Sequence, residues 1–332
     1  MAAWRQRQGE RGKRGCLGGL LLLLSASVPE ALAGTAPPGF YCTFNVADVD
    51  FGNVNVITGS GLSTTSTIRI TCRKGAAYGR VSICLSLGYG SGNPSAWNPR
   101  QMDSAGNKLN YNLYKPGTND IWGSYYWSGS AQPVRFVVNL DSAGNGSWTY
   151  NLDARIAPGQ NSVKPGLYVS NFSGPDVVFE YYHSRWTTCP LRVDGRESPA
   201  FQVRAYVIPF CEVSATDIDF GTTGLLNTNV DASGQVSVRC TNGTPYQVRL
   251  NGGQAGASSP DQRLMTKGSE SVRYGIYRDS ARTQGWGDLP GNAVAGVGTG
   301  NFQTYTTYGR VFPQTTPSPG IYTDTVVVTV VY

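Results

Sequence analysis

Residues that could carry catalytic chemistry are scarce in this sequence. The only histidine, His183, lies in the run Glu-Tyr-Tyr-His-Ser-Arg-Trp, so no histidine cluster is available to hold a metal ion. Glu180 and Ser184 are close to it in sequence, but neighbouring residues of a strand point to opposite faces, which opposes a Ser-His-acid arrangement. Asp217 and Asp219 belong to an Asp-x-Asp-Phe-Gly segment, where a role in a turn or strand edge is the simpler interpretation. We therefore predict that the protein is not an enzyme and binds no metal or cofactor.

Cysteines are the residues whose spacing does indicate chemistry, namely disulfide formation. Cys42 and Cys72 are thirty residues apart, and Cys211 and Cys240 are twenty-nine residues apart in a similar segment. Six cysteines follow residue 33, and an even number of cysteines is typical of a disulfide framework that forms in an oxidising compartment. We predict three disulfides, the last by default: Cys42–Cys72, Cys211–Cys240 and Cys84–Cys189.

The N-terminal residues have the order of a secretory signal peptide. Five basic residues precede an apolar run at residues 20–24 and a small-residue cleavage site that ends at Ala33, so we predict a signal peptide over residues 1–33. The apolar stretch is too short and interrupted to span a bilayer, and Cys16 precedes it and is expected to leave with the signal. The protein is therefore expected to be exported.

Charge and composition argue against a nucleic-acid partner and against a helical fold. Of 27 basic and 21 acidic residues, the predicted signal peptide contains 5 and 2, which leaves a net charge of +3 and no basic patch of nucleic-acid character. With 42 glycines and 14% charged residues, the composition favours short strands joined by tight turns. No amphipathic helix pattern is present.

The chain contains an internal duplication. The segment CTFNVADVDFG that begins at Cys42 matches CEVSATDIDFG that begins at Cys211, and the likeness continues towards the C-terminus. Further matching pairs are Tyr111-Asn-Leu-Tyr114 with Tyr274-Gly-Ile-Tyr277, Trp122-Gly123 with Trp286-Gly287, and Pro165-Gly-Leu-Tyr168 with Pro319-Gly-Ile-Tyr322. Each copy holds alternating runs between Gly, Pro and Asn turns, as a β-sandwich requires. We predict an all-β protein of two sandwich domains, residues 34–209 and 210–332.

The shared elements resemble the spore coat protein U domain family. Cys, Asp-Phe-Gly, Cys, Tyr-x-Leu/Ile-Tyr, Trp-Gly and Pro-Gly-x-Tyr occur in this order twice across residues 42–332. The resemblance implies an incomplete immunoglobulin-like sandwich whose last strand is supplied by the next subunit, which is donor-strand complementation. Two such domains in tandem are similar to the tip adhesin of archaic, Csu-type chaperone-usher pili. The implied partners are a periplasmic chaperone, an outer-membrane usher and an adjacent subunit that supplies a donor strand.

A strand near the end of the first copy has the pattern needed to complete that domain. Residues 201–209 alternate between an apolar and a more polar face. The apolar face consists of Phe201, Val203, Ala205 and Val207. We therefore expect this segment to act as an in-cis completing strand, so that the first domain needs no partner strand.

The second copy ends in a valine-rich strand that is followed by no such segment. One face of this strand holds Val326, Val328, Val330 and Tyr332. An unpaired valine-rich edge would template aggregation, so we expect it to be the acceptor edge for a donor strand. The alternative is an ordinary central strand that pairs within its own sheet.

The segment before the first cysteine is too short to act as a donor strand. Residues 34–41 alone lie between the predicted cleavage site and Cys42, and they include two prolines, which cannot donate to a ladder. We therefore expect a subunit that accepts a strand but has none to give. Such a subunit occupies the tip of a pilus.

Comparison of the two copies separates framework aromatics from candidate contact residues. Trp122 and Trp286 occupy equivalent places, so core packing is predicted for both. Aromatics found only in the first copy follow Gly-, Pro-, Asn- and Ser-rich segments, which lie on surfaces. These surface or ligand-binding candidates are Trp97, Tyr125, Tyr126, Trp127 and Trp148. Csu-type tips are described as contacting hydrophobic surfaces through apolar loops, so the resemblance implies adhesion to an abiotic or host surface and biofilm formation.

Two other interpretations of these aromatics and of the family remain open. Burial of the rings under a neighbouring loop would remove the contact surface. A lectin would stack the same rings on sugars and bind hydroxyls through nearby polar residues, namely Asn93, Asn98, Asn119 and Asp120. A purely structural coat or pilus-shaft subunit is the third possibility.

Overall fold

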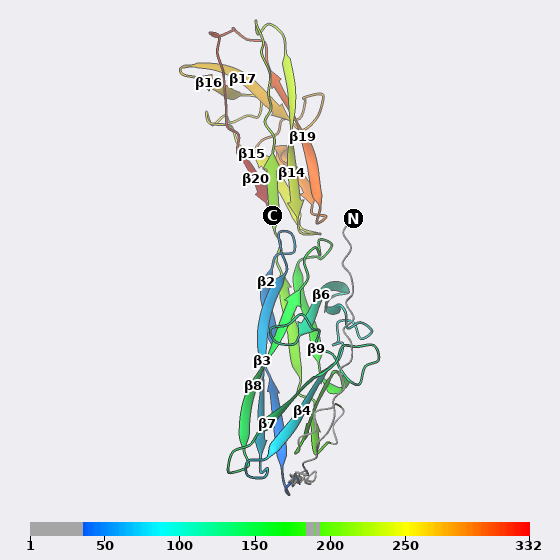
Figure 1. Cartoon of the computed structure of the whole chain (residues 1–332). Coiled ribbons are helices and arrows are strands. Elements are labelled where there is room, and N and C mark those ends of the chain that lie inside the picture. The colour runs from blue at the N-terminus through cyan, green and yellow to red at the C-terminus, as the bar shows by residue number, and fades with distance from the viewer. Residues whose placement is uncertain (1–35, 184–188, 190–192) are drawn as a thin grey trace, which may run out of the picture. The chain divides into compact units, whose positions relative to one another are not determined.

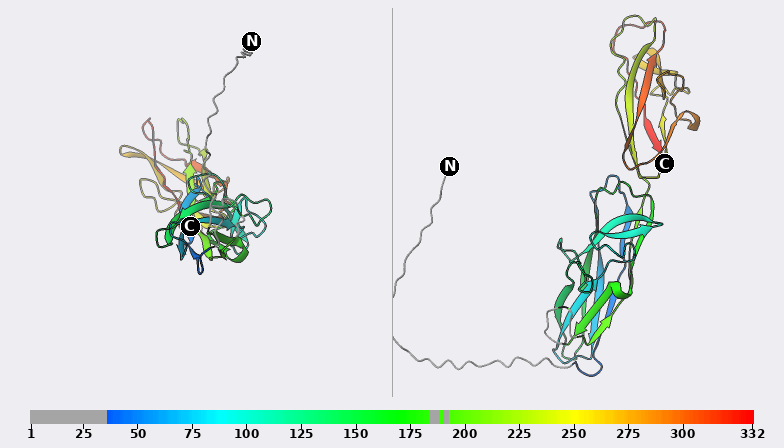
Figure 2. Two further views of the ribbon diagram at one scale, coloured as in Figure 1. Left: turned by 60° about the horizontal axis from the view of Figure 1, so that its bottom comes forward. Right: turned by 90° about the vertical axis from the view of Figure 1, so that its right-hand side faces the viewer.

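The protein is all-β, as predicted. A computed structural model describes residues 36–183, 189 and 193–332, so the predicted signal peptide lies outside the described residues. The described part contains twenty strands, two short 3-10 turns and no α-helix, and the strands can be followed in Figures 1 and 2. No helix in the described ranges is long and apolar enough to cross a membrane.

The first domain is a sandwich of two sheets joined by tight turns. In spatial order, the larger sheet consists of β1 (Tyr41–Val46), β3 (Leu62–Arg73), β8 (Gly146–Ile156), β6 (Asn107–Tyr114), β5 (Arg100–Ser104), β9 (Gly166–Phe172), β12 (Phe201–Val207) and β2 (Val49–Val54). The smaller sheet consists of β11 (Gly195–Glu197), β10 (Val177–Tyr182), β4 (Arg80–Leu87) and β7 (Val134–Asn139), with the 3-10 turn η1 (Gly174–Asp176) before β10.

The second domain repeats this plan with fewer strands. Its larger sheet consists, in order, of β13 (Cys211–Ala215), β14 (Val230–Cys240), β19 (Phe302–Val311), β17 (Glu270–Tyr277) and β16 (Arg263–Lys267). Its smaller sheet consists of β18 (Val294–Val297), β15 (Pro245–Leu250) and β20 (Val328–Val331), with the 3-10 turn η2 (Pro290–Asn292) before β18.

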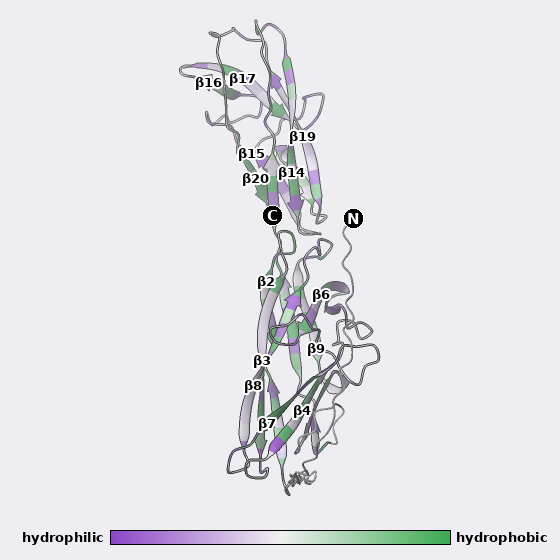
Figure 3. Ribbon diagram, in the orientation of Figure 1, coloured by the Kyte–Doolittle hydropathy of each residue, from purple (hydrophilic) through white to green (hydrophobic). Residues whose placement is uncertain are grey.

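Each domain has its own apolar core because inward-facing residues of its two sheets pack together. Figure 3 shows β4 as a largely hydrophobic strand, since both of its faces are covered in the first domain. Trp122 and Trp286 are fully buried, which confirms the predicted core packing. Each indole N–H donates to a backbone oxygen of the smaller sheet, Trp122 Nε1 to Leu85 at 2.8 Å and Trp286 Nε1 to Val248 at 3.0 Å.

The six described cysteines form the two disulfides that the duplication predicts and the third that was predicted by default. Cys42–Cys72 joins β1 to β3, and Cys211–Cys240 joins β13 to β14 at directly paired positions of the two ladders. Cys84–Cys189 joins β4 to the segment that follows β10, over a sequence separation of 105 residues. This third disulfide has no counterpart in the second domain.

A buried arginine beside each core tryptophan was not anticipated from the sequence. Arg100 is fully buried and donates to the backbone oxygens of Gly88, Leu87 and Trp122 at 2.7 to 3.0 Å. Arg263 is 1% exposed and makes the same kind of contacts in the second domain. Burial lowers the pKa of Arg100 to about 10. The signal was an arginine 22 or 23 residues before each tryptophan, a spacing that recurs in both copies.

Candidate functional site

Strand β12 lies inside the larger sheet of the first domain, between β9 and β2. It pairs with β9 in antiparallel fashion and with β2 in parallel fashion, so its backbone groups are used on both sides. Its inward-facing residues are at most 3% exposed: Phe201, Val203, Ala205 and Val207. The first domain therefore has a closed core on this side.

The second domain lacks a strand at the corresponding place. Its larger sheet stops at β16, whereas the equivalent sheet of the first domain continues through β9, β12 and β2. The counterparts of β9 and β2 are residues 320–326 and 218–223, and neither is part of a strand. Residues 320–326 make a single bridge, between Thr323 and Thr266 of β16. No described strand of the second domain occupies the place that β12 has between β2 and β9. Neither segment therefore forms a continuous ladder of backbone hydrogen bonds.

An open groove of about 980 Å³ lies between these two segments and reaches the core of the second domain. Its walls come from residues 218–223, residues 320–326 and the start of β20, and its floor comes from core residues of the larger sheet. The apolar lining includes Ile218, Phe220, Leu226, Val236, Val326 and Val328. A groove of this volume between two segments that are not part of a sheet ladder has the form of a binding site for an extended peptide strand.

The valine-rich strand β20 faces this core with one side. Val326, Val328 and Val330 are half-buried and pack against the core of the second domain. On the opposite face Val331 is 43% exposed. Tyr332, which was predicted to share the core face, lies just beyond the end of β20 and is 54% exposed, so it does not pack against the core. β20 pairs with β15 on one edge, and no other described strand pairs with it. The alternation predicted for this strand therefore separates a core face from an outer face.

One end of the groove is polar. Tyr274 donates its hydroxyl to Asp324 Oδ2 at 2.7 Å, and Asp324 Oδ1 accepts the backbone N–H of Gln254 at 2.8 Å. Burial, together with the hydrogen bond to the carboxylate, raises the pKa of Tyr274. Asp324 is therefore held by groups of its own domain.

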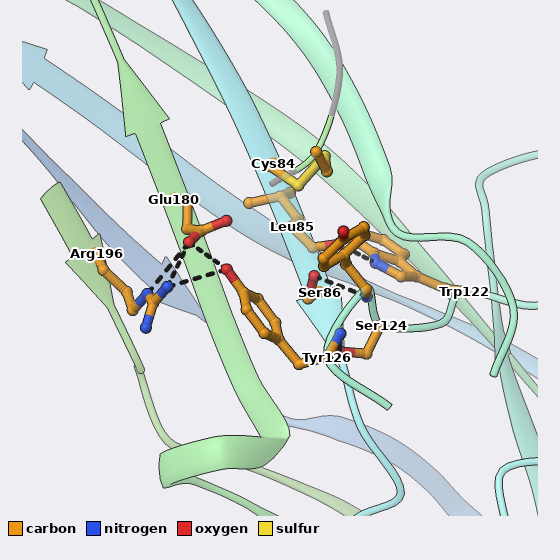
Figure 4. Close-up of a disulfide and its surroundings, with 10 residues drawn as sticks. Cys84, Leu85, Ser86, Trp122, Ser124, Tyr126, Glu180 and Arg196 are labelled. Carbon is orange, nitrogen blue, oxygen red and sulfur yellow. Dashed lines mark hydrogen bonds and ion pairs between the residues drawn. A yellow bond between two sulfur atoms is a disulfide. The ribbon is translucent and has the colours of Figure 1, made fainter. Parts of the chain in front are cut away.

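In the first domain, a buried carboxylate holds the aromatic loop that contains Tyr125, Tyr126 and Trp127. Glu180 of β10 is 1% exposed and pairs with Arg196 of β11 at 2.6 Å. The Tyr126 hydroxyl donates to the Glu180 carboxylate and accepts from Arg196 at 2.9 Å, as Figure 4 shows. Burial first, and then the bond to Glu180, raise the pKa of Tyr126 to about 12. This cluster of Tyr126, Glu180 and Arg196 fixes the loop on the outer face of the smaller sheet.

The other candidates of this region are anchored in different ways. Tyr125 is 51% exposed and contacts the edge of Tyr126 at 5.7 Å between ring centroids. Trp127 is half-buried against Tyr89, with ring centroids 4.5 Å apart, and its indole N–H donates to an oxygen of the η1 turn. Trp97 is also half-buried. Tyr125 therefore offers the most accessible ring of these residues.

Trp148 lies in β8 rather than in a loop. It is half-buried and packs against the core of the first domain, next to Tyr150 on the same face of the strand. Its ring also covers Gly146, where a Cβ would lie 2.1 Å from the indole. Trp148 therefore belongs to a strand and not to the expected loop, and part of its ring packs inward against the core.

An exposed aromatic that the sequence comparison missed is Tyr78. It is 77% exposed, adopts a left-handed backbone conformation with φ of 54°, and follows two exposed alanines. Its backbone N–H donates to the oxygen of Asp141 at 2.9 Å, so the loop is held at its base. The signal was loop length: twelve residues lie between Cys72 and Leu85, but only seven lie between the equivalent Cys240 and Val248.

Polar residues considered for catalysis or sugar binding are engaged within the first domain. His183 Nε2 accepts the backbone N–H of Ala76 at 3.1 Å. Asn93 donates to a neighbouring glutamine, and Asn119 accepts from Arg155 at 2.6 Å. Among the described residues no group of three or more His, Cys, Asp or Glu side chains could hold a metal ion. These contacts give the polar groups structural roles and leave the exposed aromatics as the better candidates for contact with a partner.

Comparison with known proteins agrees with this architecture. A family model described as the Spore Coat Protein U domain matches residues 34–173 and 198–329. No curated protein matches the sequence significantly. Among solved structures, the chaperone-tip adhesion subunit pre-assembly complex CsuC-CsuE, from archaic chaperone-usher Csu pili of Acinetobacter baumannii, is similar in fold, with 20% identity and a TM-score of 0.53. That match covers 87% of this chain and all of the other.

A second solved structure is more distant. The CupB6 tip adhesin from Pseudomonas aeruginosa has 11% identity and a TM-score of 0.39, and the match covers 90% of this chain and 95% of the other. The immunoglobulin-like pilus-subunit fold thus rests on the family match and on the first of these structures.

Proposed function

Because this chain belongs to the Spore Coat Protein U domain family, we propose that it is an adhesive subunit at the tip of a chaperone-usher pilus. In this proposal residues 34–209 form a self-completed adhesin domain, and residues 210–332 form a pilin domain that accepts a donor strand. The fold shared with a tip adhesion subunit of Csu pili supports the proposal. The protein is exported through the periplasm, where a chaperone binds it, and an outer-membrane usher then joins it to the adjacent subunit.

The open groove of the second domain is the observation that carries this proposal. In the first domain the same place is occupied by β12, which buries four apolar side chains. A strand supplied by a chaperone, and later by the adjacent subunit, would pair with residues 320–326 and residues 218–223. It would cover the core-facing valines at positions 326 and 328 and remove their contact with water.

The groove is tested by a charge placed on either face of the same strand. Val328→Asp puts a carboxylate into the groove, whereas Val331→Asp puts one on the exposed face of β20. Burying an unpaired carboxylate costs several kcal/mol, about enough to abolish strand capture. We expect the Val328 variant to be lost from chaperone complexes and from the cell surface, and the Val331 variant to be displayed. Normal surface display of the Val328 variant would refute the donor-strand part of the proposal.

Adhesion is assigned to exposed aromatic loops of the first domain. Tyr125 and Tyr78 present the most accessible rings, and Trp127 and Trp97 give partly exposed apolar surface. A ring that buries on the order of 100 Å² at ~25 cal/mol per Å² contributes about 2 to 3 kcal/mol to contact with an apolar surface. Many pili per cell would convert such weak contacts into firm attachment and biofilm formation through multivalency.

This surface is tested by attachment of piliated cells to polystyrene. Replacing both Tyr78 and Tyr125 by alanine should lower attachment several-fold while the number of pili stays unchanged. Tyr206→Ala is the matched control, because this tyrosine is 46% exposed but lies on β12 outside the loops. Equal attachment of the double variant and the control would show that these loops do not make the contact.

A further inference from the structure

In the first domain, β12 occupies the place that corresponds to the groove of the second domain, so it serves as a template for a donor strand. One flank of the template is β2, whose turn is closed by the Gly52 N–H and Asp50 Oδ1 at 2.7 Å. In the second domain the Gly221 N–H bonds Asp219 Oδ1 at 2.8 Å in the same way. Gly52 and Gly221 also share a left-handed backbone, with φ of 63° and 69°. The two segments therefore correspond residue by residue.

The other flank corresponds equally well. Tyr168 of β9 donates its hydroxyl to the backbone oxygen of Lys164 at 2.8 Å. Tyr322 donates to the oxygen of Ser318, also four residues earlier and also at 2.8 Å. Residues 320–326 thus have the same tyrosine hydrogen bond as β9. The register in which β12 pairs with β9 and β2 therefore indicates how a donor strand would pair with residues 320–326 and 218–223.

We propose that the groove selects a donor strand by a defined side-chain pattern. The strand lies antiparallel to residues 320–326, with a large apolar side chain opposite Val326, a cation beside Asp219 and a small side chain opposite Tyr322. This inference rests on the proposed function, because it specifies the partner of the same groove. The occupant is a peptide strand with the pattern of residues 201–207 of this chain.

The large apolar residue follows from a missing ring. In the first domain Phe201 is paired with Phe172, and their rings stack with centroids 4.7 Å apart and an interplanar angle of 11°. The position of Phe172 is held by Val326 in the second domain, which lines the groove. Both rings of the stack are thus absent there. A donor residue at least as large as phenylalanine is needed to fill this volume, because an unfilled cavity forfeits packing energy.

The cation follows from a carboxylate that has no ion-pair partner among the described residues. Arg204 of β12 lies beside Asp50 in the parallel register, and its guanidinium bonds Asp50 Oδ2 at 2.9 Å. Asp219 holds the place of Asp50, is exposed, and has no ion-pair partner among the described residues. A lysine or arginine at the fourth position of the donor strand would supply the missing charge.

The remaining positions follow from the same register. Ala205 is paired with Tyr168 and is 1% exposed, so a small residue is needed where the tyrosine ring fills the core. Tyr206 is paired with Leu167 on the outer face. Ile321 holds the place of Leu167 and is 84% exposed. An apolar side chain at the sixth donor position would therefore cover the most exposed isoleucine of the second domain.

The pattern is tested with a peptide that copies residues 199–209 and carries a fluorophore at its N-terminus. Its binding to the chain lacking residues 1–33 is followed by fluorescence anisotropy, with the peptide in reversed sequence order as control. We expect Phe201→Ala in the peptide to weaken binding by about 100-fold, since it deletes a buried ring. Arg204→Glu should weaken binding by about five-fold, and Asp219→Lys in the chain should restore it.

Each outcome bears on the proposal. These changes in the peptide leave the protein intact, and the exposed position of Asp219 keeps its substitution from disturbing the core. Equal binding of the peptide and its Phe201→Ala form, equal binding of the reversed peptide, or no binding at all would each overturn the proposed pattern. Whether a donor strand enters the groove is decided separately, by surface display of the Val328→Asp variant.

Discussion

Truncation of Phe201 tests whether β12 closes the core of the first domain. Phe201 is 3% exposed and stacks on Phe172, so Phe201→Ala removes a buried ring and leaves a cavity. Such truncations cost roughly 3 to 5 kcal/mol. With a denaturant slope of about 2 kcal/mol per molar urea, the midpoint of unfolding of the first domain should fall by about 2 M.

Tryptophan fluorescence is a suitable assay for this change. Five of the tryptophans fall within residues 34–209, namely Trp97, Trp122, Trp127, Trp148 and Trp186, whereas Trp286 is in the second domain, so the signal reports mainly on the first domain. Tyr206→Ala on the outer face of the same strand is the control and should cost no more than about 0.5 kcal/mol. Equal midpoints for the two variants would refute the assignment of β12 as the strand that completes the core.

Three further perturbations concern the first domain, two of them at buried polar groups and one at a disulfide. Arg100→Met leaves three backbone oxygens without donors and should lower the free energy of unfolding by about 3 kcal/mol, measured by urea denaturation; an unchanged midpoint would contradict the role given to this side chain. The folded-state pKa of Tyr126 is raised from 10 to about 12, so its contribution to stability is full below pH 10 and is lost as the pH rises to about 12. Glu180→Gln should lower the pKa of Tyr126, although burial keeps this pKa above the ordinary value of tyrosine. The ultraviolet absorbance of the tyrosinate measures the change. An unshifted titration of Tyr126 would show that the Glu180 carboxylate does not act on it. Replacing Cys84 and Cys189 by serine removes the disulfide that closes a loop of 105 residues. In the chain-entropy model the free energy of unfolding should fall by on the order of 4 kcal/mol relative to the oxidised chain. A loss below about 1 kcal/mol would contradict a stabilising role of this disulfide.

The duplication in the sequence was the strongest guide to the framework. Paired cysteines, the glycine after Asp-Phe and the Pro-Gly-x-Tyr anchor occur at matching places, and each has the same hydrogen bond or disulfide in both domains. These features depend on short-range spacing, which a sequence displays directly. The buried arginines are duplicated as well, but a charged residue in a core is rare, so an arginine in the sequence does not by itself indicate burial.

The aromatic candidates were harder to predict because exposure depends on contacts that are distant in sequence. Tyr126 and Trp127 are neighbours in the sequence, yet their contacts differ. The Tyr126 hydroxyl donates to the carboxylate of Glu180, 54 residues away, whereas the ring of Trp127 packs on Tyr89. Trp148 turned inward at the start of its strand. Tyr78 belongs to no motif, yet it is more exposed than Tyr125 and Tyr126.

What the sequence by itself determined is the fold class, the two-domain repeat, the cysteine pairing and the alternating faces of residues 201–207 and of β20. These properties follow from a two-residue strand period and from self-similarity, so they are legible along the chain. Only the tertiary structure decided that β12 lies between β9 and β2 while the equivalent place in the second domain is an open groove. That difference is set by which segments pair across the sheet, because a strand forms a ladder only where a partner lies beside it.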